Sequence, residues 1–305
     1  MKDVSNKKVA IVTGGAGFIG SNLVDQLLSL GIEVKVIDNE SSDAHDQFYW
    51  NDKSENHVID VCDYERIRPL FDGADLVFHL AAEVRIQPTI ENPVLAAQSN
   101  VVGTCTVLQC AKEAGVKRVV YSSTSAAYGL KNKLPNVEVM SNDCLNPYSV
   151  TKTAGEELCK MYTNLFGLET VIFRYFNVYG ERQPLRGQYA PVIGIFLRQK
   201  ANEEPMTIVG DGTQRRDFIH VKDVVNANIL SSDLTKNIKG ETFNIGSGTN
   251  HSILEIAELL SGDSVFIEPR LGEIKETLAD ISKAKYMLGW KPQTDLEEWI
   301  KNSQK

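Results

Sequence analysis

The sequence predicts an α/β protein built on a doubly wound parallel sheet, with a smaller mixed α/β domain toward the C-terminus. Short apolar, β-branched runs, typical of strands buried on both faces, alternate with amphipathic helical segments from Lys8 to Phe176. From Asn177 onward this alternation gives way to glycine, proline and charged residues. We therefore expect a first domain over 1–176, with a returning segment near 217–246, and a second domain over 177–216 and 247–305.

The composition is ordinary for a soluble globular protein, with 42% hydrophobic and 24% charged residues among 305. The formal net charge of −8 argues against nucleic acid or an anionic membrane surface as the main partner. No apolar run approaches the ~18 residues that span a bilayer, and no signal-peptide core precedes Val9. The five cysteines form no metal-ligand pattern with the five histidines. We therefore expect a cytoplasmic protein without a metal site.

The first strand, helix and second strand carry the pattern of a dinucleotide-binding site. The expected strand Lys8–Thr13 runs into a glycine-rich turn, Gly14–Gly20, followed by a helix over Ser21–Leu30 and a strand over Glu33–Ile37. Glycines let a pyrophosphate approach the backbone, whose N–H groups and helix dipole favour an anion. Asp38 would accept hydrogen bonds from both ribose hydroxyls of an adenosine. Because its carboxylate would repel a 2′-phosphate, we expect NAD and not NADP as the cofactor.

The following segments extend this Rossmann-type unit. A polar loop is expected over Asn39–Asn56, and a proline-punctuated loop precedes a long helix over Val94–Ala114. Asp60 is expected to meet the adenine, and His79 is expected in its strand as a core residue. The remaining expected strands are His57–Val61, Asp75–Leu80, Arg118–Ser122, Thr170–Phe176 and Glu241–Ile245, and the remaining helices are Tyr64–Phe71, Asn146–Phe166 and Pro191–Lys200.

A tyrosine and a lysine lie four residues apart at the start of one predicted helix. Tyr148 and Lys152 therefore share a helix face, one turn from each other. A nearby ammonium favours the phenolate, so Lys152 is expected to lower the Tyr148 pKa and make the tyrosine a base near neutral pH. The hydroxyl of Thr124 follows the strand Arg118–Ser122, at the sheet edge where ligands bind. With NAD in place, this set suits hydride removal from an alcohol carbon.

Two arginines beyond the first domain indicate a second anion site. Arg216 lies in a glycine-rich turn, and Arg270 lies in the C-terminal part of the chain. Guanidinium groups bind phosphate oxygens bidentately, and the chain already has one predicted pyrophosphate site. We therefore expect a substrate that carries its own diphosphate.

A set of motifs resembles the extended short-chain dehydrogenase/reductases, and within them the NAD-dependent nucleotide-sugar 4-epimerases that act on UDP-glucose or UDP-N-acetylglucosamine. The resemblance covers essentially the whole chain and implies NAD held in the first domain and a UDP-sugar in the cleft. It also implies that Tyr148 takes the 4-hydroxyl proton while C4 gives hydride to NAD, after which hydride returns to the other face of a 4-keto intermediate. The motifs are Gly14–Gly20, Asp38, Leu80-Ala81-Ala82, Asn100, Tyr148-x-x-x-Lys152, Arg174–Gly180 and Arg216–His220.

The motifs and the resemblance together assign residues to three groups. The expected catalytic residues are Thr124, Tyr148 and Lys152. The expected cofactor residues are Gly14, Gly17, Phe18, Ile19, Gly20, Asp38, Asn39, Asp60, Val61, Leu80, Ala81, Ala82, Asn100, Tyr121, Ser122, Tyr148, Lys152, Tyr175 and Val178. The expected substrate residues are Thr124, Asn177, Tyr189, Ala190, Arg216, Arg270, Glu273 and Thr277.

The resemblance gives several of these residues a specific role. It implies that Tyr121 and Ser122 line the nicotinamide side, and that Arg216 and Arg270 take the diphosphate. Tyr189 and Ala190 would flank the uridine, and Glu273 would bind its ribose. The helices over 94–114 and 146–166 would form the family's usual dimer surface, which implies a homodimer.

Departures from other branches of the family narrow the reaction. The dehydratases carry Asp-Glu directly after the threonine, and the decarboxylases carry Glu at this turn, where this chain has Ser125 and Ala126. Neither dehydration nor decarboxylation is therefore expected. A small residue seven positions after Arg270 admits N-acetylhexosamines in the epimerases, and here it is Thr277. The interpretation favours UDP-GlcNAc/UDP-GalNAc, with UDP-Glc/UDP-Gal as further substrates. UDP-glucuronate stays open, because no residue excludes a carboxylate.

Two other functions stay open. A net reductase of the same fold would act on a 4-keto sugar nucleotide and consume its reduced cofactor. A non-catalytic NAD-binding sensor would have no need for the intact set of Thr124, Tyr148 and Lys152.

Overall fold

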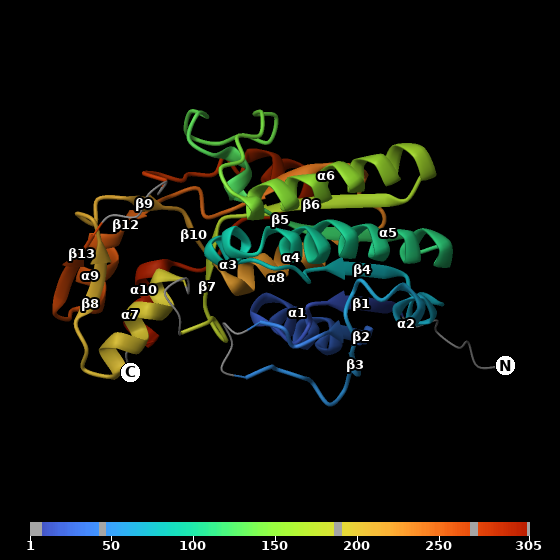
Figure 1. The fold of residues 1–305 in the computed structure, drawn as a ribbon, viewed down its shortest axis with the longest axis horizontal. Helices are drawn as coiled ribbons and strands as arrows, with labels where there is room; N and C mark the ends of the chain where they lie inside the picture. Colours follow the sequence, from blue (N-terminus) through green and yellow to red (C-terminus); the bar gives the residue numbers. More distant parts are fainter. Residues whose placement is uncertain (1–7, 43–46, 186–190, 269–273, 304–305) are drawn as a thin grey trace.

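The computed structural model describes residues 8–42, 47–185, 191–268 and 274–303. Its centre is a seven-stranded parallel sheet with the order β11-β6-β5-β4-β1-β2-β3 (Figure 1). The strand order reverses between β1 and β4, which confirms the predicted doubly wound fold and places a crevice at their carboxyl ends. The strands are β1 (Val9–Thr13), β2 (Glu33–Asp38), β3 (Glu55–Val58), β4 (Leu76–His79), β5 (Arg118–Thr124), β6 (Glu169–Tyr175) and β11 (Thr242–Ile245).

Helices cover both faces of this sheet. On one face, α1 (Phe18–Ser29) and α8 (Val221–Ser231) bury apolar side chains in a first core. On the other face, α5 (Gly103–Ala114) and α6 (Pro147–Phe166) fill a second core. Because successive strand residues point to opposite faces, β1 contributes alternately to both cores, which explains its continuous apolar run.

The segment before α5 differs from the predicted loop and single long helix. The expected loop holds a short helix, α3 (Ile86–Glu91), whose Pro88 lies in the first turn, where a missing N–H is tolerated. The expected helix consists of α4 (Pro93–Ala97), a π-helical turn η2 (Gln98–Val102) and then α5. The π turn brings the side chain of Asn100 inward, where it is fully buried.

Other element boundaries also differ from the predictions. β3 begins at Glu55 and ends at Val58, so the expected cofactor residues Asp60 and Val61 lie after the strand. The helix expected over 64–71 is α2 (Tyr64–Ile67) followed by the 3₁₀ turn η1 (Arg68–Phe71), because Pro69 has no N–H for an α-helical bond. β5 continues two residues further than predicted and ends at Thr124.

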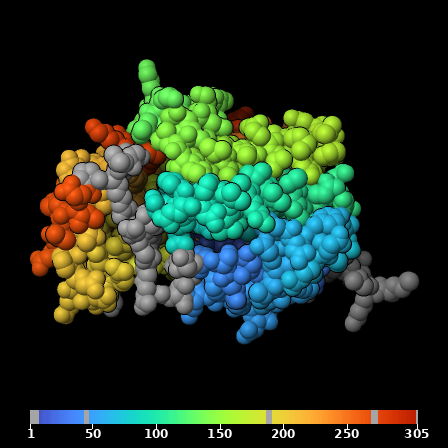
Figure 2. All heavy atoms as spheres, viewed as in Figure 1, coloured from blue at the N-terminus to red at the C-terminus, as the bar shows by residue number. Residues whose placement is uncertain are grey.

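Most segments after β6 form a second group of elements at one end of the sheet, yellow, orange and red in Figure 1 and on the left of Figure 2. Its core lies between three helices and a two-stranded parallel sheet. Two further two-stranded pairs, β7–β10 and β9–β12, follow the main sheet as separate small sheets. The elements are β7 (Asn177–Tyr179), α7 (Val192–Ala201), β8 (Met206–Val209), β9 (Arg215–Arg216), β10 (Phe218–His220), β12 (His251–Ser252), α9 (Ile253–Leu260), β13 (Ser264–Ile267) and α10 (Leu296–Ser303).

Two later segments pack with the main sheet. β11 pairs with β6 at the sheet edge, which is the return that the sequence indicated for Glu241–Ile245. The π-helical turn η4 (Ala284–Leu288) and Trp290 also belong to the first core, although they fall in the range 247–305 expected for the second domain. The C-terminal part of the chain therefore serves both groups of elements.

One continuous helical stretch, Pro93–Ala114, has the length and apolar composition of a membrane span, which the sequence analysis did not single out. Its inner side chains Val107 and Leu108 are fully buried in the second core. Core helices of soluble proteins have this same composition, and packing on the sheet accounts for the buried side chains of this stretch.

Candidate active site

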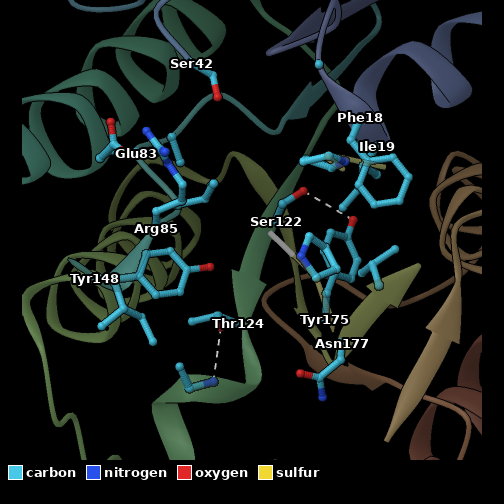
Figure 3. A pocket seen from close by; sticks show the side chains of 18 of the residues that line it. Phe18, Ile19, Ser42, Glu83, Arg85, Ser122, Thr124, Tyr148, Tyr175 and Asn177 are labelled. Carbon is cyan, nitrogen blue, oxygen red and sulfur yellow. Dashed lines mark hydrogen bonds between the residues drawn. The ribbon is translucent and has the colours of Figure 1, made fainter. Parts of the chain in front are cut away.

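A cleft of about 1100 Å³ runs from the carboxyl ends of the sheet strands to the second group of elements. Its walls include the glycine turn, the ends of β4 and β5, the start of α6 and the strand β7. Figure 3 shows Thr124, Tyr148 and Asn177 around this space, together with Phe18 and Ile19 from the start of α1. The cleft therefore gathers most of the predicted cofactor, catalytic and substrate residues.

The glycine turn is held by close backbone approaches. Gly14 has a φ of 68°, and a Cβ there would lie 2.7 Å from the amide nitrogen of Ala81. A Cβ on Gly20 would lie 2.1 Å from the carbonyl oxygen of Gly14. Helix α1 starts after Gly17, and no described side chain caps it, so its first N–H groups face a turn without side-chain bulk. This geometry fits the pyrophosphate of a dinucleotide.

The acidic residue at the end of β2 lies where a ribose acceptor is required. Asp38 is buried, and its two carboxylate oxygens accept the backbone N–H groups of Ala16 at 3.1 Å and Glu40 at 2.9 Å. Nearby, Asn39 donates to the Asp60 carboxylate at 2.9 Å. These three polar residues line the cleft with Val61, as predicted for the adenosine end.

The predicted Leu80-Ala81-Ala82 segment lines the cleft directly beside the glycine turn. The Ala81 N–H donates to the Thr13 hydroxyl at 3.3 Å, and that hydroxyl also contacts His79 Nδ1 at 2.7 Å. His79 is buried in β4 and its Nε2 lies 2.9 Å from the Thr104 hydroxyl. Burial lowers the His79 pKa to about 3, with the Lys152 charge adding to it, so the ring is neutral. The prediction of a core histidine is confirmed.

The catalytic set is positioned by the end of β5 and the start of α6. Asn146 caps α6 by accepting the Ser149 N–H at 2.9 Å, and Pro147 occupies the first helical position. Tyr148 and Lys152 then face the cleft from consecutive turns. The Thr124 hydroxyl accepts the Ala126 N–H at 3.1 Å and is therefore fixed at the strand end (Figure 3).

Burial dominates the protonation of this set. Burial raises the Tyr148 pKa, and the hydrogen bond from Thr124 opposes this only in part. Burial also lowers the Lys152 pKa to about 8, while the nearby Cys159 and Glu156 side chains oppose this shift. The predicted lowering of the Tyr148 pKa by Lys152 is therefore wrong for the protein without ligands. Burial takes the phenolate out of water, and this cost is the largest influence on the Tyr148 pKa.

Two predicted cofactor residues do not line the cleft. The Tyr121 side chain is fully buried in the second core, and its hydroxyl donates to the Lys152 carbonyl at 3.1 Å. Asn100 is also fully buried, where its side chain bonds the backbone N–H and C=O of Glu83 and the Thr151 hydroxyl. Both residues support the walls of the cleft from behind, and sequence patterns alone do not separate a wall from its support.

The remaining cofactor-side residues lie together. The Ser122 hydroxyl donates to the Tyr175 hydroxyl at 3.2 Å, and Tyr175 in turn is bonded to the Asn228 amide at 2.9 Å. Burial raises the Tyr175 pKa to about 12, so the phenol stays neutral. Ser122, Tyr175 and Val178 line the cleft as predicted.

The substrate half brings together residues that are far apart in the sequence. The Asn177 amide donates to the Asp217 carbonyl at 3.0 Å and to the Thr277 hydroxyl at 3.3 Å. The Thr277 hydroxyl also accepts the Asp217 N–H at 3.1 Å. Arg216 on β9 lines the same side of the cleft. Four other predicted substrate residues, Tyr189, Ala190, Arg270 and Glu273, lie outside the described residues.

The sequence analysis missed one wall of the cleft. Residues 83–87 and Ile90, in and before α3, line it beside Tyr148, and Glu83 and Arg85 are labelled in Figure 3. Burial raises the Glu83 pKa, while backbone N–H groups of Arg85 and Val84 oppose the shift. Their place in the sequence could have indicated this wall, because these residues directly follow Ala81-Ala82 at the carboxyl edge of the sheet, where ligands bind.

Comparisons with known proteins agree with this architecture. Residues 10–246 match the model of the NAD dependent epimerase/dehydratase family. The chain is 38% identical over 299 residues to a putative UDP-glucose 4-epimerase from Methanocaldococcus jannaschii, covering 95% of each chain. It is 35% identical to a UDP-glucuronate 4-epimerase from Thermodesulfobacterium geofontis, covering 96% of this chain and 94% of that protein.

A solved structure shares the fold over nearly the whole chain. It is the UDP-N-acetylglucosamine 4-epimerase from Methanobrevibacter ruminantium M1 in complex with UDP-N-acetylmuramic acid. The TM-score is 0.91, with 32% identity and 97% of each chain covered. The chain therefore belongs to the NAD-dependent epimerase/dehydratase family, and its cofactor is NAD.

Proposed function

We propose that this protein catalyses the reversible C4 epimerisation of a UDP-sugar through a transient 4-keto intermediate. The convergence of Thr124, Tyr148 and Lys152 on the cofactor cleft carries this proposal. The two residues that follow Thr124 are Ser125 and Ala126. Neither can exchange a proton with carbon near neutral pH, so this turn offers no group for dehydration after the oxidation.

In the proposed reaction, Tyr148 removes the proton of the 4-hydroxyl and later returns it. NAD supplies the hydride acceptor for C4 and the donor for the opposite face. The Thr124 hydroxyl acts as hydrogen-bond partner of the reacting oxygen. With both ligands bound, the positive charge of Lys152 favours the phenolate form of Tyr148.

Within this reaction we favour UDP-GlcNAc/UDP-GalNAc, with UDP-Glc/UDP-Gal as a second pair. The support is Thr277, a short side chain whose hydroxyl is held by Asn177 and by the Asp217 N–H. It leaves the cleft wall without the bulk that would exclude an N-acetyl group. Steric pockets discriminate by about 1–3 kcal/mol per group, so turnover of both pairs is consistent with this wall.

UDP-glucuronate is a second candidate, favoured by a different residue. The Arg85 side chain lines the cleft beside α3. A guanidinium there suits the planar carboxylate of a uronic acid.

The diphosphate is proposed to bind Arg216 and Arg270, the uridine to lie against Tyr189 and Ala190, and its ribose to meet Glu273.

The test is incubation of the purified protein with UDP-GlcNAc, UDP-Glc and UDP-GlcA in separate reactions, followed by anomeric-proton NMR. We expect the C4 epimer of UDP-GlcNAc to accumulate to equilibrium without net formation of NADH. Fastest turnover of UDP-GlcA would replace the favoured sugar by the second candidate. Unchanged UDP-sugars after long incubation would contradict the epimerase proposal and favour a sensor, whereas stoichiometric oxidation of NADH by a 4-keto sugar nucleotide would favour a reductase.

We also infer a cytosolic homodimer. The outer faces of α4, η2 and α6 expose apolar side chains that a partner helix pair would cover: Val94, Leu95, Val102, Val150, Met161 and Leu165. The five cysteines are free thiols, which fits a reducing compartment. Light scattering on the purified protein tests the dimer, and a Leu165→Glu variant should shift the mass toward one chain.

A further inference from the structure

Tyr121 contacts Lys152 at both ends of the lysine. The Lys152 ammonium nitrogen lies 4.4 Å from the centre of the Tyr121 ring. The Tyr121 hydroxyl donates to the Lys152 backbone carbonyl at 3.1 Å. A single rigid side chain on β5 therefore contacts both the backbone carbonyl of Lys152 and the ammonium group at the tip of its flexible side chain on α6.

A glycine in α6 makes this contact possible. A Cβ on Gly155 would lie 2.1 Å from the Tyr121 hydroxyl oxygen and 2.5 Å from the ring carbon that carries it. Glycine inside a helix is unfavourable compared with alanine. Here it leaves room for the hydroxyl end of the Tyr121 ring to approach α6, beside Lys152.

The groups around the ammonium leave the ring as its direct contact. No hydrogen bond to Lys152 Nζ is formed among the described residues. His79 on β4 is neutral, and burial keeps the Cys159 pKa raised, so its thiol stays protonated. Glu156, one turn further on α6, is buried in an ion pair with Arg174 at 2.7 Å.

The remaining titratable neighbours of the ammonium are the two tyrosines. Burial raises the pKa of both Tyr121 and Tyr148, so neither carries a charge in the protein without ligands. An aromatic face attracts a cation most strongly when the cation is desolvated, as Lys152 is here.

We propose that Tyr121 is the positioning residue of Lys152, with its ring holding the ammonium at the cleft and its hydroxyl fixing the lysine backbone. The proposal rests on the catalytic role proposed above for Lys152. It assigns a function to a residue that does not line the cleft.

Two substitutions separate the ring from the hydroxyl. Tyr121→Leu keeps apolar volume but removes the aromatic face, and we expect kcat to fall by about tenfold with KM for the UDP-sugar nearly unchanged. The Lys152 ammonium loses its proton as the pH rises, so kcat should fall at high pH, and we call this fall the high-pH limb of the profile. Without the ring, burial favours the neutral amine more strongly, so this limb should move to lower pH. Tyr121→Phe keeps the ring, and we expect it to rescue the position of this limb.

Gly155→Ala perturbs the same contact from the other side. Its methyl group must displace the Tyr121 ring, so we expect a loss of kcat and the same shift of the pH limb as in Tyr121→Leu. Tyr162→Leu is the matched control. Tyr162, on α6, is a buried tyrosine like Tyr121. Its hydroxyl donates a hydrogen bond to Gln109, and it does not line the cleft. The control should change the melting temperature without moving the pH limb.

The outcomes distinguish the two levels of the proposal. Lys152→Met, measured in parallel, tests the catalytic role of Lys152. Full activity in that variant would overturn both this catalytic role and the positioning role of Tyr121. Loss of activity in Lys152→Met, together with an unchanged kcat and pH limb in Tyr121→Leu, would overturn the positioning role alone. If Tyr121→Leu does not fold, the limb in Gly155→Ala decides, and a limb at the wild-type pH contradicts the proposal.

Discussion

The two halves of the cleft are built on different principles. The cofactor half consists of consecutive strand ends of one parallel sheet, and its shape comes from backbone that approaches closely at Gly14 and Gly20. The substrate half is assembled from side chains that lie up to 100 positions apart: Asn177 on β7, Arg216 on β9, and Thr277 in the irregular segment after the isolated bridge at Glu276. The first half is therefore a local sequence property, whereas the second depends on how distant segments fold together.

Tyr148→Phe should give the largest effect, because Tyr148 acts where the two halves meet. General acid–base catalysis contributes about 10²–10⁴-fold, so we expect kcat to fall by that factor while NAD and UDP-sugar still bind. Single-turnover kinetics measure the loss in rate, and binding isotherms for NAD and for the UDP-sugar measure whether both ligands still bind. Tyr64→Phe, on α2 and away from the cleft, is the control. Wild-type turnover in Tyr148→Phe would remove the proposed base.

Gly14→Ala tests the backbone-built half. The substitution adds strain at a positive φ, about 1–2 kcal/mol, and places a methyl group 2.7 Å from the Ala81 nitrogen. We expect lower thermal stability and loss of NAD affinity, measured by melting and fluorescence titration. Gly73→Ala is matched, since Gly73 also has a positive φ (77°) but no atom within 4 Å of the added Cβ. Equal losses in both variants would show that the close approach has no role.

Thr277→Tyr tests the side-chain-built half. A bulky ring should reduce kcat/KM for UDP-GlcNAc by about 10–200-fold relative to UDP-Glc, because the N-acetyl group loses its space. NAD affinity should not change, since the cofactor half is separate. Thr277→Ser keeps the hydroxyl that Asn177 and Asp217 use and should retain the wild-type preference. A parallel loss for both sugars would mean that Thr277 supports Asn177 and does not select the sugar.

The pH dependence gives the smallest effect. Burial lowers the Lys152 pKa to about 8, so the fraction of charged ammonium falls as pH rises through that value. If the charge is required, kcat/KM should fall about tenfold between pH 7 and pH 9, following that group in the free enzyme. A profile that is flat over this range would contradict the role of the charge, and Lys152→Arg should abolish the limb because a guanidinium stays protonated.

Almost all residues that the sequence assigns to the cofactor line the cleft. Strand, glycines, helix and Asp38 follow one another, so their relation in space is fixed by local geometry. Tyr121 and Asn100 are the exceptions there, because the motif shows that a residue belongs to the site but not which face of the wall it occupies. The π turn at Gln98–Val102 that buries Asn100 has no clear sequence signal.

The substrate half was predictable only through the resemblance. Nothing local in the sequence indicates that Thr277 bonds Asn177, or that residues 83–87 form a wall opposite them. The protonation of Tyr148 was also beyond the sequence, because it depends on burial and not on the spacing to Lys152. Residues that act through tertiary packing are the ones that local patterns miss.

The most direct test of the account follows the hydrogen at C4. A UDP-sugar carrying deuterium at C4 is converted in ordinary water, and the C4 position of the product is read by NMR and mass spectrometry. The account predicts that the epimer retains its deuterium, because hydride leaves for the bound NAD and returns within the same site. Replacement of the deuterium by a solvent proton would contradict it.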